Sequence, residues 1–184
     1  NNRGGLHNRI TCKLRLEPFS LSETRKFLEY NKVKFTKQQI IELYMAIGGI
    51  PHYLNHIDKS LSALQNIDNL CFSKNGILVG EYNNLIPSLF GEAEIYKEII
   101  RVIAASFYGI ERRELIKKLK ITSGGRLNQK LNELEEAGFI MRFVPYGHKK
   151  RGNFYRVIDE YTLFYLKWIE PKLLTINLQA NSYG

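Results

Sequence analysis

The chain has 184 residues, of which 44% are apolar, with a formal net charge of +9 and a mean hydropathy of −0.27. This length and apolar content suit one or two small domains with packed cores. No apolar run approaches the roughly 20 residues that cross a bilayer, so we expect no membrane partner. Cys12 and Cys71 stand alone without metal-ligand spacing, which indicates reduced thiols in a cytoplasmic protein.

The N-terminal segment predicts one strand without a sheet. The first residues, Asn1-Asn2-Arg3-Gly4-Gly5, carry no starting Met and no apolar signal core, and we expect from them a cut through a longer protein. Residues 10–16 alternate apolar with polar or basic side chains, a pattern typical of a strand, and Pro18 ends it. A lone strand needs neighbouring strands to form a sheet, which also supports a cut through a longer protein.

A run of helices follows up to Gly91, where we expect a joint. The predicted spans are 20–30, 36–47, 51–57, 60–72 and a helix from the Lys74-Asn75-Gly76 turn to about residue 90. Hydroxyl side chains cap three of them: Ser20 or Ser22 caps the first, Thr36 the second and Ser60 the fourth. Pro51 suits the first turn of the third helix.

The next segment matches the order of a winged helix-turn-helix. Helical spacing of apolar residues predicts helices over 93–107, 111–119 and 126–137, with a turn at 122–125 before the third. Gly138 suits a left-handed helix end. Two β-rich runs, 139–144 and 153–158, then predict a hairpin with a basic tip.

The charge of the chain is concentrated in this segment. Residues 101–156 hold 13 lysines and arginines against 5 acidic residues, a net charge of +8. Such a concentration is typical of a protein that binds a phosphate backbone, and duplex DNA is the favoured partner. In a winged helix the third helix enters the major groove and the wing lies on the backbone. The candidate DNA-binding residues are therefore Arg126, Asn128, Gln129 and Lys130 on the third helix, and Lys149, Lys150 and Arg151 on the wing.

Two further patterns favour structural roles. The last predicted helix, 159–170, carries Tyr161, Phe164, Tyr165 and Trp168 in one stripe, which we interpret as a face that packs the helix onto the winged helix. A stacking platform for single strands is the alternative. His52 and His56 have the spacing of a helical metal pair but no third ligand nearby, so we expect no metal site.

Several motifs together resemble the archaeal-type ATPases of the AAA+/STAND neighbourhood. Leu6-His7-Asn8-Arg9 followed by Pro18-Phe19-Ser20 is similar to the end of an ATPase core and the turn that opens its helical lid. Gly48-Gly49-Ile50-Pro51-His52-Tyr53-Leu54 resembles the lid motif Gly-Gly-x-Pro-x-Tyr-Leu. Residues 134–140 and 159–165 resemble further parts of the family, so the likeness extends over nearly the whole chain.

The resemblance implies ATP and magnesium as cofactors of a complete protein. Family members hold nucleotide with a Gly-Lys-Ser/Thr loop, and this chain has no Gly-Lys dipeptide, so we expect no cofactor and no ATP hydrolysis in this chain alone. Residues 154–160 mimic a magnesium-binding strand, but their position in the wing argues against that role. Arg9 matches an arginine finger that acts on a neighbour's γ-phosphate, with a structural arginine as the alternative. Pro51 matches a proline near adenine, with helix initiation as the alternative.

These observations predict a mainly α fold in which a helical lid-type domain precedes a winged helix-turn-helix with a β-hairpin wing. The expected parts are a core remnant at 1–19, the lid domain at 20–91, the winged helix at 92–158 and the aromatic helix and tail at 159–184. The expected function is the C-terminal part of an ATPase whose winged helix binds DNA. Its expected partners are the missing N-terminal ATPase core, nucleic acid and a further copy in a homo-oligomer. Two alternatives stay open: a protein-interaction or autoinhibitory module, and a free-standing DNA-binding regulator.

Overall fold

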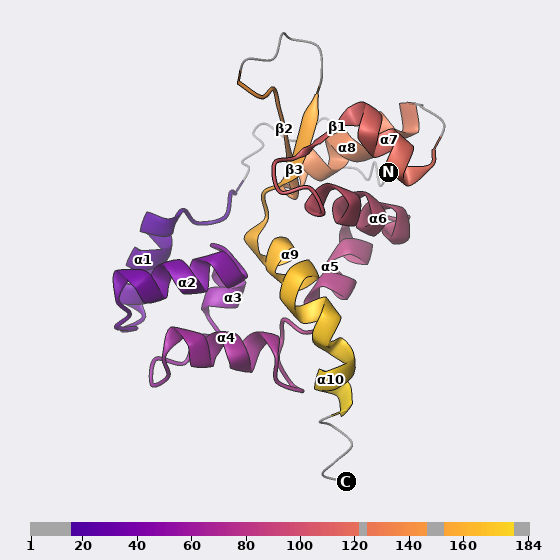
Figure 1. Ribbon diagram of the computed structural model, residues 1–184. Coiled ribbons are helices and arrows are strands. Elements are labelled where there is room, and N and C mark those ends of the chain that lie inside the picture. Colours follow the sequence, from indigo (N-terminus) through magenta and orange to yellow (C-terminus); the bar gives the residue numbers. More distant parts are fainter. Residues whose placement is uncertain (1–15, 122–124, 147–152, 179–184) are drawn as a thin grey trace, which may run out of the picture.

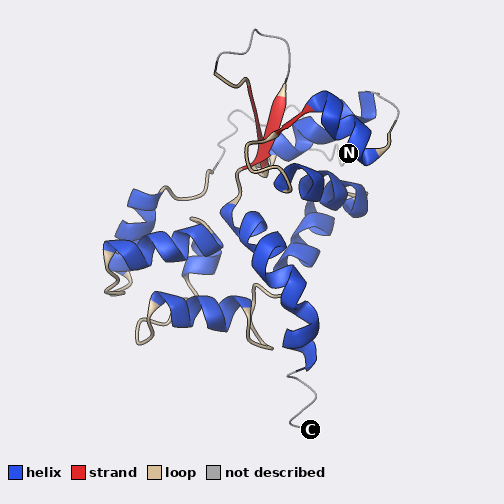
Figure 2. Ribbon diagram, in the orientation of Figure 1, coloured by secondary structure: helices blue, strands red, loops and turns tan. Residues whose placement is uncertain are grey.

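The computed structural model describes residues 16–121, 125–146 and 153–178 and is mainly helical, with one small antiparallel sheet (Figures 1 and 2). The helical segment α1–α4 lies at one end of the molecule, and α7, α8 and the hairpin lie at the other. The expected fold class, a helical domain followed by a helix-turn-helix with a β-hairpin, is confirmed. No helix in the described ranges is long and apolar enough to cross a membrane.

The first five helices are α1 (Leu21–Tyr30), α2 (Lys37–Ile47), α3 (Pro51–Leu54), α4 (Ala63–Cys71) and α5 (Glu81–Leu89). Hydroxyl side chains cap α1, α2 and α4, whereas α3 begins at Pro51 and α5 begins after Gly80 without a side-chain cap. Ser20, one of the two serines predicted, caps α1 and Thr36 caps α2 as predicted, and each forms a capping box. The predicted cap at Ser60 is wrong: the Asp58 carboxylate accepts from the backbone and hydroxyl of Ser60 and holds it in a turn, and Ser62 caps α4 instead. Burial raises the pKa of the free Cys71 thiol, at the end of α4, to about 12.

Two consecutive glycines join α2 to the chain that enters α1. Gly48 ends α2 at φ +68, in the region that favours glycine. Gly49 lies directly against Phe19, whose backbone N–H donates to the Gly49 carbonyl over 2.8 Å. A Cβ on Gly49 would stand 1.9 Å from the Phe19 carbonyl oxygen, so no larger residue fits without a backbone shift. The two segments that carry the lid resemblance, around Phe19 and around Gly49, are therefore in direct contact.

The basic segment has the order helix, strand, helix, helix, hairpin. Its elements are α6 (Ala93–Ala104), β1 (Ile110–Glu111), α7 (Arg112–Leu119), α8 (Gly125–Glu136), β2 (Ile140–Phe143) and β3 (Phe154–Val157). The three strands form an antiparallel sheet in the order β1-β3-β2, with Ile110 and Arg142 on either side of Tyr155. Strand β1 was not predicted, because two residues carry no period of their own and depend on pairing with β3. Gly138 ends α8 at φ +83, as predicted.

The last helix returns to the first domain. It comprises α9 (Glu160–Phe164), a π-helical turn η1 (Tyr165–Ile169), a 3₁₀ turn η2 (Glu170–Lys172) and α10 (Leu173–Leu178). The Tyr161 hydroxyl donates to the Leu78 carbonyl over 2.7 Å and accepts from the Tyr82 backbone N–H over 3.0 Å. The Tyr165 ring stacks on Tyr82 with 4.6 Å between centroids. The expectation that this aromatic stripe packs onto the winged helix is therefore wrong, because its buried tyrosines bind the helical domain.

The π-turn also changes which side chain completes the stripe. Regular α-helical spacing predicted Trp168 seven residues after Tyr161. A π-turn inserts one residue, so the buried series runs Tyr161, Tyr165, Ile169, each at most 1% exposed. Trp168 is displaced from the packing face and is 47% exposed.

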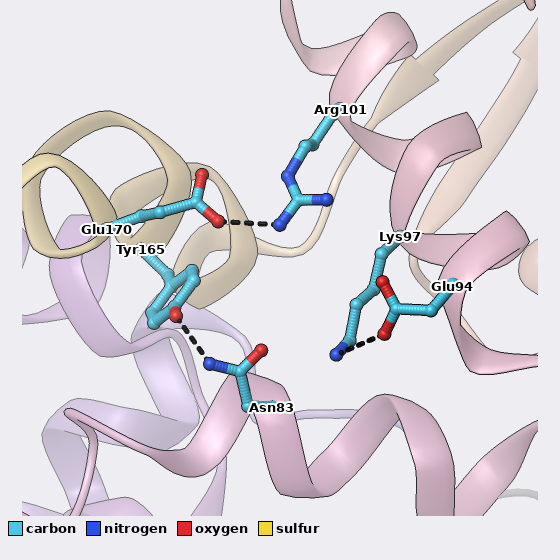
Figure 3. A network of polar contacts seen from close by, with 6 residues as sticks. All are labelled: Asn83, Glu94, Lys97, Arg101, Tyr165 and Glu170. Atoms are coloured by element: carbon cyan, nitrogen blue, oxygen red, sulfur yellow. Dashed lines mark hydrogen bonds and ion pairs between the residues drawn. The ribbon is translucent and has the colours of Figure 1, made fainter.

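Polar contacts join this last helix to the neighbouring helices (Figure 3). Arg101 of α6 forms an ion pair with Glu170 at 2.7 Å. Asn83 of α5 donates to the Tyr165 hydroxyl over 3.0 Å. The chain that follows the winged helix is thus attached both to the helical domain and to the first helix of the basic segment.

Candidate nucleic-acid interface

The residues predicted on the third helix do not share one surface. Arg126 and Lys130 of α8 both reach Glu92, just before α6: Arg126 Nη2 lies 3.9 Å from its carboxylate, and Lys130 Nζ forms a hydrogen-bonded ion pair with it. These two positive charges, Lys130 first, hold the pKa of Glu92 below its usual range. The Glu92 carboxylate therefore pairs with two of the four residues predicted to contact DNA from the third helix.

Lys130 and Gln129 are engaged within the protein. Lys130 is only 8% exposed, and its ammonium lies 4.5 Å from the centroid of the Tyr96 ring. Gln129 donates to Glu133 over 2.9 Å, and Glu133 also accepts from the Tyr96 hydroxyl. These contacts give Lys130 a packing role between α8 and α6. Arg126 differs, because its side chain is 89% exposed.

Asn128 faces a second cluster of cations, between α8, α7 and the hairpin. Its side-chain oxygen accepts from Arg112 Nε over 3.1 Å. Arg142 of β2 lies 3.8 Å from Glu135 of α8. Arg142 is the cross-strand partner of Tyr155. Burial raises the pKa of Tyr155, and the positive charges of Arg142 and Arg112 act against that rise.

Helix α7 adds exposed cations beside this cluster. Arg113, Lys117 and Lys120 are exposed, and Lys118 pairs with Glu114 at 3.1 Å within the helix. The N-terminus of α7 is held to the hairpin, because the Arg112 backbone N–H donates to the Asn153 carbonyl over 2.9 Å. Arg112 therefore has a defined position relative to both α8 and the sheet.

Sequence reasoning missed three polar residues of these elements. Arg112, Asn132 and Arg142 were not predicted as site residues, although Asn132 is exposed and follows Asn128 by four residues on the same helix. That spacing was a usable signal. Arg142 gave none, because its place beside α8 depends on how the hairpin packs.

The remaining predicted residues lie elsewhere. Lys149, Lys150, Arg151 and Arg9 lie outside the described residues. Pro51 is exposed at the first turn of α3, and its neighbours Ile50 and His52 line a cavity of about 430 Å³ between the helical domain and the winged helix. The rings of His52 and His56 meet edge to face, 5.2 Å apart. Within the described ranges, no group of three or more metal-ligating side chains is present.

Comparison with known proteins adds one distant likeness. No family model matches the chain, and no curated protein matches it significantly. A solved structure, the Walker-type ATPase PABY2304 of Pyrococcus abyssi, is similar at 19% identity with a TM-score of 0.48. The match covers 82% of this chain and 42% of that chain, so this chain spans less than half the length of that ATPase. Its own residues must therefore carry any proposal about function.

Proposed function

We propose that the winged-helix segment binds duplex DNA through the surface between α8, α7 and the hairpin. The observation that carries the proposal is that two arginines are held against α8: Arg112 donates to the exposed Asn128 over 3.1 Å, and Arg142 of β2 lies 3.8 Å from Glu135. Guanidinium groups suit phosphates, and an asparagine on the third helix suits the edge of adenine. The net charge of +8 in residues 101–156 supports the same partner.

The proposal assigns different roles to the two kinds of contact. Arg112, Arg142 and the wing residues Lys149, Lys150 and Arg151 contact phosphates and set affinity. Asn128 and Asn132 contact bases and set sequence preference. Gln129 joins them once it leaves Glu133. Arg126 reaches a phosphate once it leaves Glu92, since its side chain is exposed.

Fluorescence anisotropy with a labelled duplex at several salt concentrations tests this. Replacing Arg112 and Arg142 with Gln should weaken binding to every duplex and reduce the slope of log affinity against log salt by about 0.9 per lost phosphate contact. The matched control replaces Lys26 and Lys34, which are exposed in the helical domain, with Gln. It removes the same charge and should leave the slope nearly unchanged. If both variants lost the same duplex affinity, net charge rather than a defined contact surface would explain the binding.

A protein-interaction module is the second candidate, and one observation favours it. Glu92 and Glu133 already engage Arg126, Lys130 and Gln129, so part of the third helix is occupied by internal contacts. Failure of the folded chain to bind duplex at low salt would select this candidate over DNA binding.

We further propose that the chain is part of an ATPase-related protein, with the helical domain as its lid. The support is the contact between the segments that carry the resemblance: Phe19 bonds to Gly49, and Gly48 lies against Glu160. In a full-length protein with a Gly-Lys-Ser/Thr loop, Arg9→Ala should lower turnover and leave nucleotide affinity largely intact, because a finger acts on transition-state charge. Unchanged turnover would make Arg9 structural. Micromolar binding of Mg-ATP to this chain alone would contradict the assignment of the phosphate site to another segment.

A further inference from the structure

A groove of about 640 Å³ lies on the opposite side of the last helix from its buried tyrosines, between α2, the end of α6 and η1. Its lining is largely apolar and includes Met45, Phe107, Leu163 and Trp168. Phe107 is 89% exposed, Met45 64% and Trp168 47%. Tyr108, 86% exposed, extends this surface, because its ring meets the Phe107 ring at 5.1 Å. Large side chains gathered in this way indicate an interaction surface.

The π-turn of η1 is what presents Trp168 to this groove. Without the extra residue, Trp168 would continue the buried series of Tyr161 and Tyr165, whereas the turn puts Ile169 there. A π-turn is rare and occurs mostly as a single turn within an α-helix, frequently at a functional site. Here it leaves a large aromatic side chain in solvent, which the packing of the domain does not require.

The charges of the groove leave one net positive group. Arg101 and Glu170 neutralise each other across 2.7 Å (Figure 3). Lys167 is the remaining charged side chain of the lining, and its ammonium lies 5.2 Å from the centroid of the Trp168 ring. A carboxylate on a bound partner would therefore find Lys167 beside the aromatic floor.

The charge of the surface separates two kinds of occupant. A covered aromatic side chain contributes roughly 150–250 Å², so the partly exposed aromatic and aliphatic side chains here offer on the order of 500 Å² of apolar surface. The chain has a net charge of +9, and Lys167 is the remaining charged side chain of the groove, so an acidic partner is favoured over a second copy. An amphipathic helix fits such an apolar groove with side chains at i, i+3, i+4 and i+7.

We propose that this groove binds an amphipathic helix of a partner protein, with leucine or phenylalanine on its apolar face and an acidic residue on its flank that pairs with Lys167. Trp168 and Phe107 form the apolar floor under that helix. The site is separate from the DNA-binding surface proposed above, and the two stand or fall independently.

The chain's single tryptophan makes the test specific, because Trp168 is the only source of tryptophan fluorescence. Two 18-residue helical peptides serve as probes, with the same leucine and phenylalanine face but with glutamate or lysine on the flanks. The glutamate peptide should shift Trp168 emission to shorter wavelength, and its labelled form should show saturable anisotropy. Phe107→Ser should weaken that binding roughly tenfold or more. Tyr30→Ser, which changes an 86% exposed aromatic residue on α1, is the matched control and should not.

Each remaining outcome is decisive. Lys167→Gln should weaken binding of the glutamate peptide and should not weaken binding of the lysine peptide. Equal binding of both peptides to the unaltered chain would overturn the acidic partner, and binding of neither would overturn the docking site. Self-association of the chain that Phe107→Ser abolishes would assign the groove to a second copy. A red shift of Trp168 emission on deleting residues 179–184 would assign it to the chain's own C-terminal segment.

Discussion

Replacing Tyr161 with Phe should remove the main polar attachment of the last helix to the helical domain. The Tyr161 ring is 1% exposed and packs against Tyr53 at 5.4 Å, and Phe preserves that packing. The lost hydroxyl donates to the Leu78 carbonyl and accepts from the Tyr82 N–H, so the substitution leaves two buried backbone groups without this partner. Each such group costs about 1–3 kcal/mol, and we expect a loss of about 2–4 kcal/mol in the free energy of unfolding. That is a large part of the roughly 5–15 kcal/mol of a typical domain.

Urea unfolding followed by circular dichroism measures this loss. The urea midpoint should fall by about 1 M. The slope of the free energy of unfolding against urea concentration should not change, because the surface exposed on unfolding is the same. Tyr165→Phe is the matched control on the same helix, because its hydroxyl accepts one hydrogen bond from the exposed Asn83 side chain. We expect that variant to lose only about 0.5–1 kcal/mol. Equal losses in the two variants would refute the assignment of the attachment to the Leu78–Tyr82 segment.

Three further predictions follow from charges and backbone contacts. Burial raises the pKa of Asp159. The stability that this carboxyl contributes is therefore present at low pH and is lost as pH rises through its native pKa. Asp159→Asn should raise the melting temperature at pH 7, and this gain should shrink as pH falls. Glu92→Gln should strengthen duplex binding roughly threefold at low salt, measured by anisotropy, because it removes the carboxylate that competes for Arg126. Gly49→Ala should cost about 2–4 kcal/mol in urea unfolding because its Cβ meets Phe19. Gly91→Ala, with no neighbouring atom within 4 Å of its Cβ, should be neutral, and a neutral Gly49→Ala would show that the Phe19 segment is not bound there.

Local signals predicted much of the fold. The hydroxyls of Ser20 and Thr36 form the capping boxes that their spacing indicated, and Gly138 has the positive φ expected of a helix end. The start of α4 was placed at Ser60, although Ser62 is the serine that Gln65 follows three residues later, the spacing of the capping box seen in the structure. The π-turn left no mark in the sequence, because the apolar period of residues 161–169 fits an α-helix equally well.

The candidate site was less accessible to sequence reasoning. Arg126, Asn128 and Lys130 have similar donor chemistry, and their helix predicts that they are near one another, but not which carboxylates they meet. Glu92 lies 34 positions before Arg126 and reaches it only through the packing of α6 against α8. Arg142 lies opposite Tyr155 in the sheet, and the backbone of Arg112 bonds to Asn153, so contacts between segments far apart along the chain set their positions. Long-range packing, rather than residue type, therefore decides which cations remain on the surface.

The last helix returns to the first helices, so the segment from α6 to β3 is joined to the same helices at both of its ends. Its entry at Gly91 and its exit at Ile158 lead into the same helical core, and Arg101 is bonded to Glu170 beyond the exit. A module attached by one linker can swivel, whereas one held at both ends turns only with its support. A force applied at the hairpin would thus be transmitted through both chain connections, one into α5 and one into α9, and Tyr161 bonds these two helices together. Movement of either part is mechanically coupled to the other.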